Sequence, residues 1–354
     1  MPSVHRRSTL DLPGSTAPSG LPAIATPNRR ACLRTLLGGT LVAVAAPASA
    51  QATTASVADE TWTDTARKRD VPLRIRWPEA DRSGAAQPVV LFSHGLGGTR
   101  DGGSVWGEAW ARAGLVVVHL QHAGSDLAAV RASASSFNDK AGLRAAAGAE
   151  QLLARLRDVA FMLDQIALRH AARQERWAGV RPTAVGMSGH SFGAHTTLGM
   201  AGQRYPGFDG ISEPRLASFI AFSPTVPMIG DAQRAFDRMR RPVLSITGTR
   251  DQDVVGNGAT PDKRMAVFAS LPKGDKAHLV LQDADHMTFG GQTGRPAEIV
   301  PREPVTRDLQ GAHHALVAAI TSDWWRATLL ADAAARARLV APAGLRSGDL
   351  WQTA

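Results

Sequence analysis

The stretch that most constrains the fold is RPTAVGMSGHSFGAHTTLGM, residues 181–200 of the 354-residue chain. It opens with an apolar, strand-forming run at residues 183–187 and continues from Ala194 as a run compatible with a helix. Residues 189–193, GHSFG, join the two runs and have the pattern G-x-S-x-G. A serine on a sharp strand-to-helix turn needs small neighbours, and the helix that follows directs its N–H groups toward the turn. The pattern can arise by chance in a glycine-rich chain, but the flanking strand and helix favour Ser191 as a nucleophile.

Short apolar runs alternate with helix-compatible segments through most of the remaining chain. Buried strands are expected at residues 88–93, 115–120, 217–222, 242–247 and 276–282. Helices are expected at residues 105–113, 263–271 and 312–331, and within residues 128–170 with a break near 133–139. Two antiparallel strands, at 61–65 and 71–77, open the domain, and a tail containing proline and glycine closes it. This order predicts an α/β fold in one domain, residues 51–354, with a mainly parallel sheet and helices on both faces.

The N-terminal segment, residues 1–50, has the features of an export signal. Residues 1–28 are rich in Pro, Ser, Thr and Gly without a hydrophobic period, and are expected to be a disordered extension or an over-long start. Paired arginines at 29 and 30, an apolar run at 35–46 and the Ala-Ser-Ala of 48–50 then follow. This order predicts a twin-arginine signal peptide and an exported protein, periplasmic or secreted; a disordered basic tail is the alternative. The apolar run is too short for a membrane span, which needs about 20 residues.

The charge of the chain gives little support to a nucleic-acid partner. The net charge is +9, but residues 1–50 hold five arginines and one aspartate, so their removal leaves +5. The remaining arginines are scattered among alanines without a dense basic run. The single cysteine, Cys32, also lies in the signal segment. The mature chain would therefore have neither a disulfide nor a cysteine nucleophile.

A serine nucleophile needs a histidine, because its hydroxyl is weakly nucleophilic until a base takes the proton. His286 is the best candidate of 11 histidines, since it follows a predicted strand in a polar loop. His190 adjoins the serine in sequence, but its side chain is expected to point away at the turn. His195 lies one turn into the helix and is expected to be a packing residue.

The histidine in turn needs a carboxylate that fixes its tautomer and stabilises the imidazolium. Asp251 and Asp253 both lie just beyond the strand expected at 242–247. Asp251 is the first carboxylate after that strand, and it gives the chain order Ser191, Asp251, His286, which is the order of the α/β-hydrolase triad. Each acid taken alone could equally be a solvated turn residue, and Asp253 remains open as the alternative acid.

Two backbone N–H groups are expected to stabilise the oxyanion of a tetrahedral intermediate. One belongs to Phe192, immediately after the serine. The second belongs to Leu96, in the HGLGG loop of residues 94–98 that follows the strand at 88–93. The alternative is a glycine turn that merely ends this strand. Ligands of open α/β sheets bind beyond the carboxyl ends of the strands, where all these loops lie.

No cofactor or metal is expected. Four histidines stand in pairs that could ligate a metal ion, but no cluster of carboxylates accompanies them: His119, His122, His313 and His314. The expected partners are a small-molecule, lipid or polymer ester, with no nucleic acid and no stable membrane span. The oligomeric state stays open.

Five motifs give the chain a resemblance to a known group of enzymes. They are SHGLGGTRDG (93–102), VVVHLQHAGSD (116–126), GHSFGAHT (189–196), ITGTRD (246–251) and DADHMTFGG (283–291). Over roughly residues 60–330 the chain resembles the α/β-hydrolases called predicted dienelactone hydrolases. These are similar to platelet-activating-factor acetylhydrolases and to cutinase-like, polyester-degrading enzymes. The resemblance implies an α/β-hydrolase fold, a triad of Ser191, Asp251 and His286, and an oxyanion hole from Leu96 and Phe192.

The resemblance implies ester hydrolysis more strongly than lactone hydrolysis. True dienelactone hydrolases use a cysteine nucleophile, whereas position 191 is serine. We therefore expect a cofactor-independent serine carboxylester hydrolase that works through an acyl-enzyme, acting on short-chain esters because its cleft is lined by glycines. The alternatives are a phospholipid acetylhydrolase or lipase, a polyester hydrolase, and a non-catalytic binding protein on the same fold. All three triad residue types are present, which argues against the binding protein.

Overall fold

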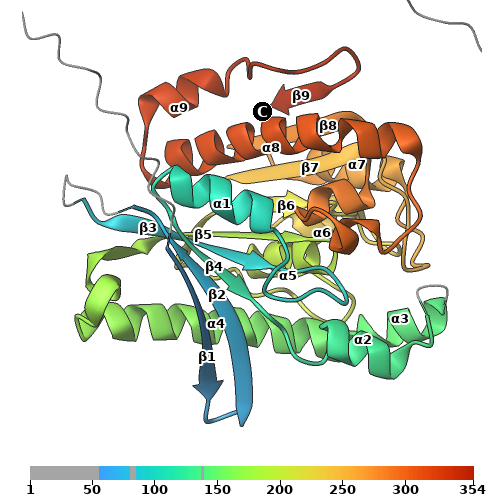
Figure 1. Cartoon of the computed structure of the whole chain (residues 1–354). Helices are drawn as coiled ribbons and strands as arrows, with labels where there is room; N and C mark the ends of the chain where they lie inside the picture. Colours follow the sequence, from blue (N-terminus) through green and yellow to red (C-terminus); the bar gives the residue numbers. More distant parts are fainter. Residues whose placement is uncertain (1–55, 80–84, 137–138) are drawn as a thin grey trace, which may run out of the picture. The chain divides into compact units, whose positions relative to one another are not determined.

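The fold is built on a nine-stranded sheet, seen in a computed structural model that describes residues 56–79, 85–136 and 139–354 (Figure 1). The spatial order of the strands is β1-β2-β4-β3-β5-β6-β7-β8-β9. The six strands from β4 to β8 pair in parallel, while β1, β2 and β9 are antiparallel to their neighbours. The bounds are β1 Ser56–Asp64, β2 Arg69–Trp77, β3 Gln87–Ser93, β4 Val116–Leu120, β5 Val180–His190, β6 Leu216–Phe222, β7 Val243–Arg250, β8 Lys276–Asp285 and β9 Leu350–Thr353.

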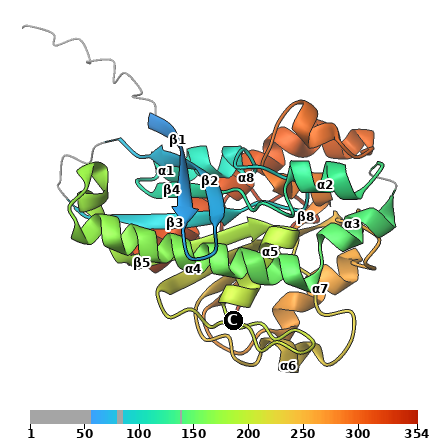
Figure 2. The same cartoon turned by 90° about the horizontal axis from the view of Figure 1, so that it is seen from below.

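Helices cover both faces of this sheet, as the sequence predicts (Figures 1 and 2). One face carries α1 (Ser104–Arg112) and α8 (Pro304–Leu329), with α9 (Ala333–Arg338) against α8. The other carries α4 (Ala149–Ala171), α5 (Phe192–Met200), α7 (Pro261–Ser270) and α6 (Ala232–Phe236). Two short helices, α2 (Leu127–Ser133) and α3 (Lys140–Ala146), lie between β4 and α4 in the sequence. The α/β prediction is thus confirmed.

The central strands read as continuous apolar runs because both of their faces are buried. In β3, Val89 and Leu91 pack into the core on the α4/α5 face. Val90 and Phe92 alternate with them and pack under α1 and α8. All four side chains are at most 1% exposed, so neither face of this strand could take a polar residue without a partner.

The C-terminal tail differs from the expectation, because it contains α9 and a ninth strand. β9 pairs antiparallel with β8, with Leu350 opposite Val280. Trp351 anchors it, since its indole Nε1 donates to the carbonyl of Leu339 at 2.9 Å. Four residues are too few for a hydrophobic period, so this strand depends on the β8 edge that it covers.

The predicted signal peptide, its paired arginines and Cys32 lie outside the described residues, and the boundary at residue 50 stays a prediction. Within residues 56–79, 85–136 and 139–354, no helix has the length and apolar character needed to cross a bilayer.

Candidate active site

Ser191 lies at the tip of the turn between β5 and α5, where the sequence predicts a nucleophile. Its φ of 56° and ψ of −114° lie outside the ordinary regions for an L-residue. The turn is held by the N–H of Ser191, which donates to the carbonyl of Phe222 at 3.0 Å. A Cβ at Gly193 would lie 1.9 Å from the carbonyl oxygen of Ser93, and one at Gly189 would lie 2.3 Å from that of Gly193. The two glycines of the motif are therefore required by close backbone contacts.

His286 reaches the serine from the end of β8. It is the first residue of a 3-10 helix, His286–Gly290, and it is 4% exposed. Its Nε2 lies 2.9 Å from Ser191 Oγ, and its Nδ1 lies 2.7 Å from Asp251 Oδ1. Because a carboxylate only accepts hydrogen bonds, the ring proton resides on Nδ1, and Nε2 is free to accept from the serine hydroxyl.

Asp251 follows directly after β7 and is fully buried. Its Oδ2 accepts from Thr247 Oγ1 at 2.8 Å, and its Oδ1 lies 3.0 Å from Arg264 Nε. Burial acts to raise the pKa of Asp251, but Arg264 and His286 more than offset it and lower the pKa to about 2. Arg264 could not be recognised from the sequence, because its position on α7 resembles any other polar position of a helix.

Asp253 has a different environment from Asp251. Its carboxylate accepts from the backbone N–H groups of Val255, Gly256 and Gly258 at 2.9, 2.7 and 2.6 Å. These bonds shape the loop after β7. Of the two acids left open by the sequence, the structure places Asp251 against His286.

The two N–H groups expected to bind an oxyanion lie in loops on either side of Ser191. Within the described part of the chain, the N–H groups of Leu96 and Phe192 donate to no other group. Phe192 is the first residue of α5, where N–H groups are free of intrahelical bonds. The loop of Leu96 is anchored by Gly97, whose N–H donates to the carbonyl of Ser125 at 3.0 Å. Both donors are thus available to a ligand.

The two histidines near the nucleophile do not lie between the serine and the acid. His190 is buried and packs its ring 4.6 Å from that of His286, and its Nε2 donates to the His286 carbonyl at 2.9 Å. It therefore supports the His286 backbone rather than simply pointing away, which the sequence did not predict. Burial lowers the pKa of His195 to about 4, and its ring contacts Tyr205 edge-on.

Three of the four histidines considered as metal ligands form hydrogen bonds with other groups of the protein. His119 Nδ1 donates to the carbonyl of Gly102 at 2.8 Å, and His314 Nε2 donates to that of Thr288 at 3.0 Å. His122 Nδ1 lies 2.9 Å from Asp158 Oδ2. His313 is buried on α8. Among the residues that the structure describes, no group of three or more His, Cys, Asp or Glu side chains could hold a metal ion.

Two cavities meet at Ser191 and His286. The larger has a volume of about 590 Å³ and is lined largely by apolar side chains, among them Leu127, Val130 and Leu143 of α2 and α3. The smaller, of about 390 Å³, lies along α5 and includes His195 and Tyr205 in its lining. A substrate held at Ser191 could therefore extend in two directions.

A comparison with known families matches part of the chain. Residues 67–176 match the family model described as platelet-activating factor acetylhydrolase, isoform II. The matched segment runs from the turn before β2 into the 3-10 helix Glu175–Gly179 that follows α4; it includes Leu96, while Ser191 lies beyond it. The match supports the resemblance to α/β-hydrolases of this group that the motifs indicate. No curated protein matches the chain.

Proposed function

We propose that the protein is a serine carboxylester hydrolase that works through an acyl-enzyme. The observation that carries this proposal is the continuous hydrogen-bonded series from Ser191 Oγ to His286 at 2.9 Å and from His286 to Asp251 at 2.7 Å. Ser191 and His286 line both cavities. The family match points in the same direction, to a hydrolase acting on esters.

Each group has a role in the proposed reaction. Ser191 Oγ attacks the carbonyl carbon of the ester while its proton passes to His286 Nε2, and the buried carboxylate of Asp251 stabilises the imidazolium. The negative charge that forms on the carbonyl oxygen is bound by the N–H groups of Leu96 and Phe192. His286 then protonates the departing alkoxide as the C–O bond breaks. Water, deprotonated by His286, then attacks the acyl carbon; the bond from that carbon to Ser191 Oγ breaks, Oγ takes the proton from His286, and the acid is released.

The favoured substrates are esters with a short acyl chain and a large apolar alcohol. The two unequal cavities support this choice, because acyl and alcohol groups leave the tetrahedral carbon in different directions. A cavity of about 390 Å³ suits a small group, and one of about 590 Å³ with apolar walls suits a larger one. An acetyl ester of a phospholipid has this shape and is the specific candidate that the family match favours.

Covalent labelling tests the proposal directly. A fluorophosphonate probe should add one label per chain, and peptide mass analysis should place it on Ser191. Ser191→Ala should remove the label and lower turnover by several orders of magnitude, because triad members act as a unit. Ser347→Ala, at an exposed loop position, is the matched control and should behave as the native protein. Retention of most esterase activity by Ser191→Ala would refute the proposed function.

A further inference from the structure

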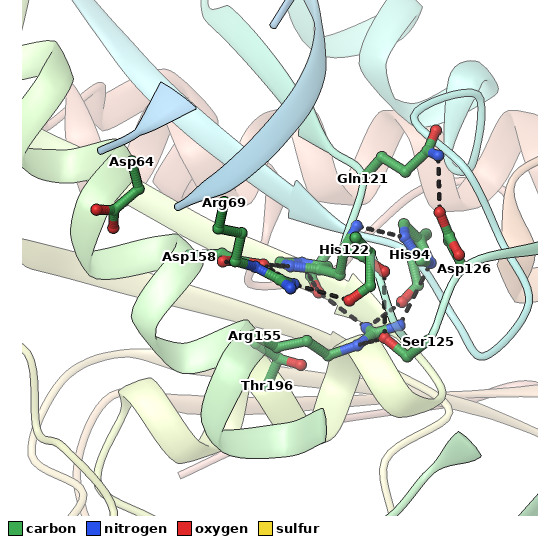
Figure 3. Close-up of polar contacts among 12 residues, drawn as sticks. Asp64, Arg69, His94, Gln121, His122, Ser125, Asp126, Arg155, Asp158 and Thr196 are labelled. Carbon is green, nitrogen blue, oxygen red and sulfur yellow. Dashed lines mark hydrogen bonds and ion pairs between the residues drawn. The ribbon is translucent and has the colours of Figure 1, made fainter. Parts of the chain in front are cut away.

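A buried arginine, Arg155, contacts the loop of residues 94–98, which carries the Leu96 N–H (Figure 3). Arg155, on α4, is 0% exposed. Its Nη1 donates to the carbonyl of His94 at 2.6 Å and its Nη2 to the carbonyl of Gly95 at 3.3 Å. Its Nε donates to Ser125 Oγ at 2.8 Å. Its guanidinium also lies over the ring of Phe192, 4.3 Å from the centroid. One cation therefore contacts both segments that supply the oxyanion donors.

The charge of Arg155 is not balanced by direct pairing. Among the described residues, no ion pair with a carboxylate includes this guanidinium. The nearby Asp158 instead accepts from Arg67 at 2.8 Å, from Arg69 at 2.7 Å and from His122 at 2.9 Å. Burial lowers the pKa of Arg155 to about 9, so it remains protonated at neutral pH. Burying a cation with only neutral acceptors lowers the stability of the folded protein, and two of these acceptors are carbonyls of the loop that carries the Leu96 N–H.

The Gly95 carbonyl belongs to the same peptide unit as the N–H of Leu96. A peptide unit is planar, and its C=O and N–H point in opposite directions. Groups that hold the carbonyl on the Arg155 side therefore present the N–H of Leu96 on the other side. A cation at the oxygen end also polarises the peptide, which strengthens the N–H as a donor.

His94 donates a hydrogen bond to the same carbonyl, and the protonation state of its ring is fixed. Its Nε2 accepts from the backbone N–H of His122 at 3.0 Å, so its proton resides on Nδ1. Nδ1 lies 2.6 Å from the oxygen of Gly95 and donates to it. Burial and the neighbouring Arg155 hold the pKa of His94 well below its usual range, so this ring stays neutral. The orientation of the Gly95–Leu96 peptide is thus fixed by the neutral His94 and the cationic Arg155, together with the N–H of Gly98, which donates to the same oxygen at 3.1 Å.

We propose that Arg155 is a positioning residue for the oxyanion hole, holding the Leu96 and Phe192 N–H groups in place and lending them its positive charge. The inference rests on the proposed ester hydrolysis at Ser191, and it adds a group that never touches the substrate. Arg155 should therefore stabilise the transition state, in which negative charge develops on the carbonyl oxygen, and should contribute little to substrate binding.

The test compares Arg155→Met, which removes the charge at similar volume, with Arg155→Lys, which keeps it. We expect Arg155→Met to lower kcat by about 10²-fold, the scale of a lost oxyanion donor, with KM changed by less than about threefold. Arg155→Lys should recover part of this loss. Arg76→Met is the matched control, because Arg76 is also buried but lies on β2 beside Glu108, and it should keep native kcat.

A second measurement separates this role from simple structural support. A trifluoromethyl ketone labelled with ¹³C at its carbonyl adds the Ser191 hydroxyl across the C=O bond and gives a hemiketal whose oxygen occupies the oxyanion hole. Its ¹³C resonance reports the pKa of that oxygen. The pKa should rise in Arg155→Met and rise less in Arg155→Lys. A lowered kcat with an unchanged hemiketal pKa, or a native kcat in folded Arg155→Met, would overturn the proposal.

If Arg155→Met fails to fold, Ser125→Ala provides the test, because it removes the acceptor of Arg155 Nε and, besides that, only a long hydrogen bond of 3.4 Å to the His122 carbonyl. A raised hemiketal pKa in folded Ser125→Ala or Arg155→Lys supports the role, and an unchanged pKa in both refutes it. Failure of this inference is distinguishable from failure of the proposed function. In the first case Ser191→Ala remains inactive, whereas in the second it keeps activity.

Discussion

Arg264 forms a buried ion pair with Asp251, with 3.0 Å between its Nε and Oδ1 of the carboxylate. The same guanidinium donates from Nε to the backbone carbonyl of Asp251 at 2.9 Å. The acid that faces His286 is therefore fixed through both its side chain and its main chain. Since α7 carries Arg264 and β7 leads to Asp251, the pair also ties a helix to the catalytic end of the sheet.

The first prediction concerns stability in acid. The pKa of Asp251 is lowered from 3.8 to about 2, so its ionisation stabilises the folded protein above about pH 4. This contribution, on the order of 2 kcal/mol, is lost as the pH falls toward 2. Arg264→Met should raise the pKa of Asp251 and shift the acid-unfolding transition to higher pH, as followed by tryptophan fluorescence in urea.

Arg250→Met is the control for that experiment, because Arg250 is more exposed and pairs with Asp283 at the surface. It should leave the acid transition where it is in the native protein, since exposed pairs contribute little. Equal shifts in both variants would show that the effect comes from net charge and not from Asp251.

The second prediction distinguishes the two acids. Asp251→Asn should lower turnover by about 10⁴, because the neutral amide favours the wrong tautomer of the histidine. Asp253→Asn should cost less than about tenfold, since it affects only the loop that its carboxylate caps. Steady-state kinetics on folded variants give the ranking. The reverse ranking would assign the triad role to Asp253.

The third prediction concerns the larger cavity. Val130 lines it and is 6% exposed. Val130→Phe should lower kcat/KM for acetyl esters of long-chain alcohols by about tenfold or more while acetyl esters of methanol or ethanol are unaffected, because added volume excludes only the bulky group. Val340→Phe, at a position 80% exposed, is the matched control. Equal losses on both ester classes would mean that the cavity does not receive the alcohol.

The fourth prediction concerns export. We propose that Arg29 and Arg30 direct a folded precursor through the twin-arginine route, with cleavage after Ala50. Changing both arginines to lysine should leave the precursor in the cytoplasm of a bacterial host, as shown by fractionation and N-terminal mass analysis. Unimpaired export of the double variant would exclude that route.

The sequence predicted the parts of the site that follow from strand ends. Ser191, Asp251 and His286 each come four residues after a predicted strand and directly after the observed strands β5, β7 and β8, and parallel strands place their carboxyl ends at one edge of a sheet. The glycines around Ser191 could be recognised from the G-x-S-x-G pattern, but the contact of Gly193 with the Ser93 carbonyl, 100 positions earlier in the chain, could not. The mainly parallel α/β architecture followed from the same alternation of strands and helices.

The arginines could not be predicted in this way. Arg155 and Arg264 lie on helices where a long polar side chain normally extends into solvent. Their burial depends on which loops pack above each helix, and that is decided by tertiary structure. The same holds for His190, whose contact with the backbone of His286 joins residues 96 positions apart.

The short strand β9 has a consequence for the strand that carries His286. Without Leu350–Thr353, β8 would form the outer edge of the sheet, and the backbone groups of residues 277–280 would lose their partners. Such edges recruit strands from other molecules and promote aggregation. By pairing with β8, Leu350–Thr353 therefore protect the strand that leads to His286 from pairing with a neighbouring molecule.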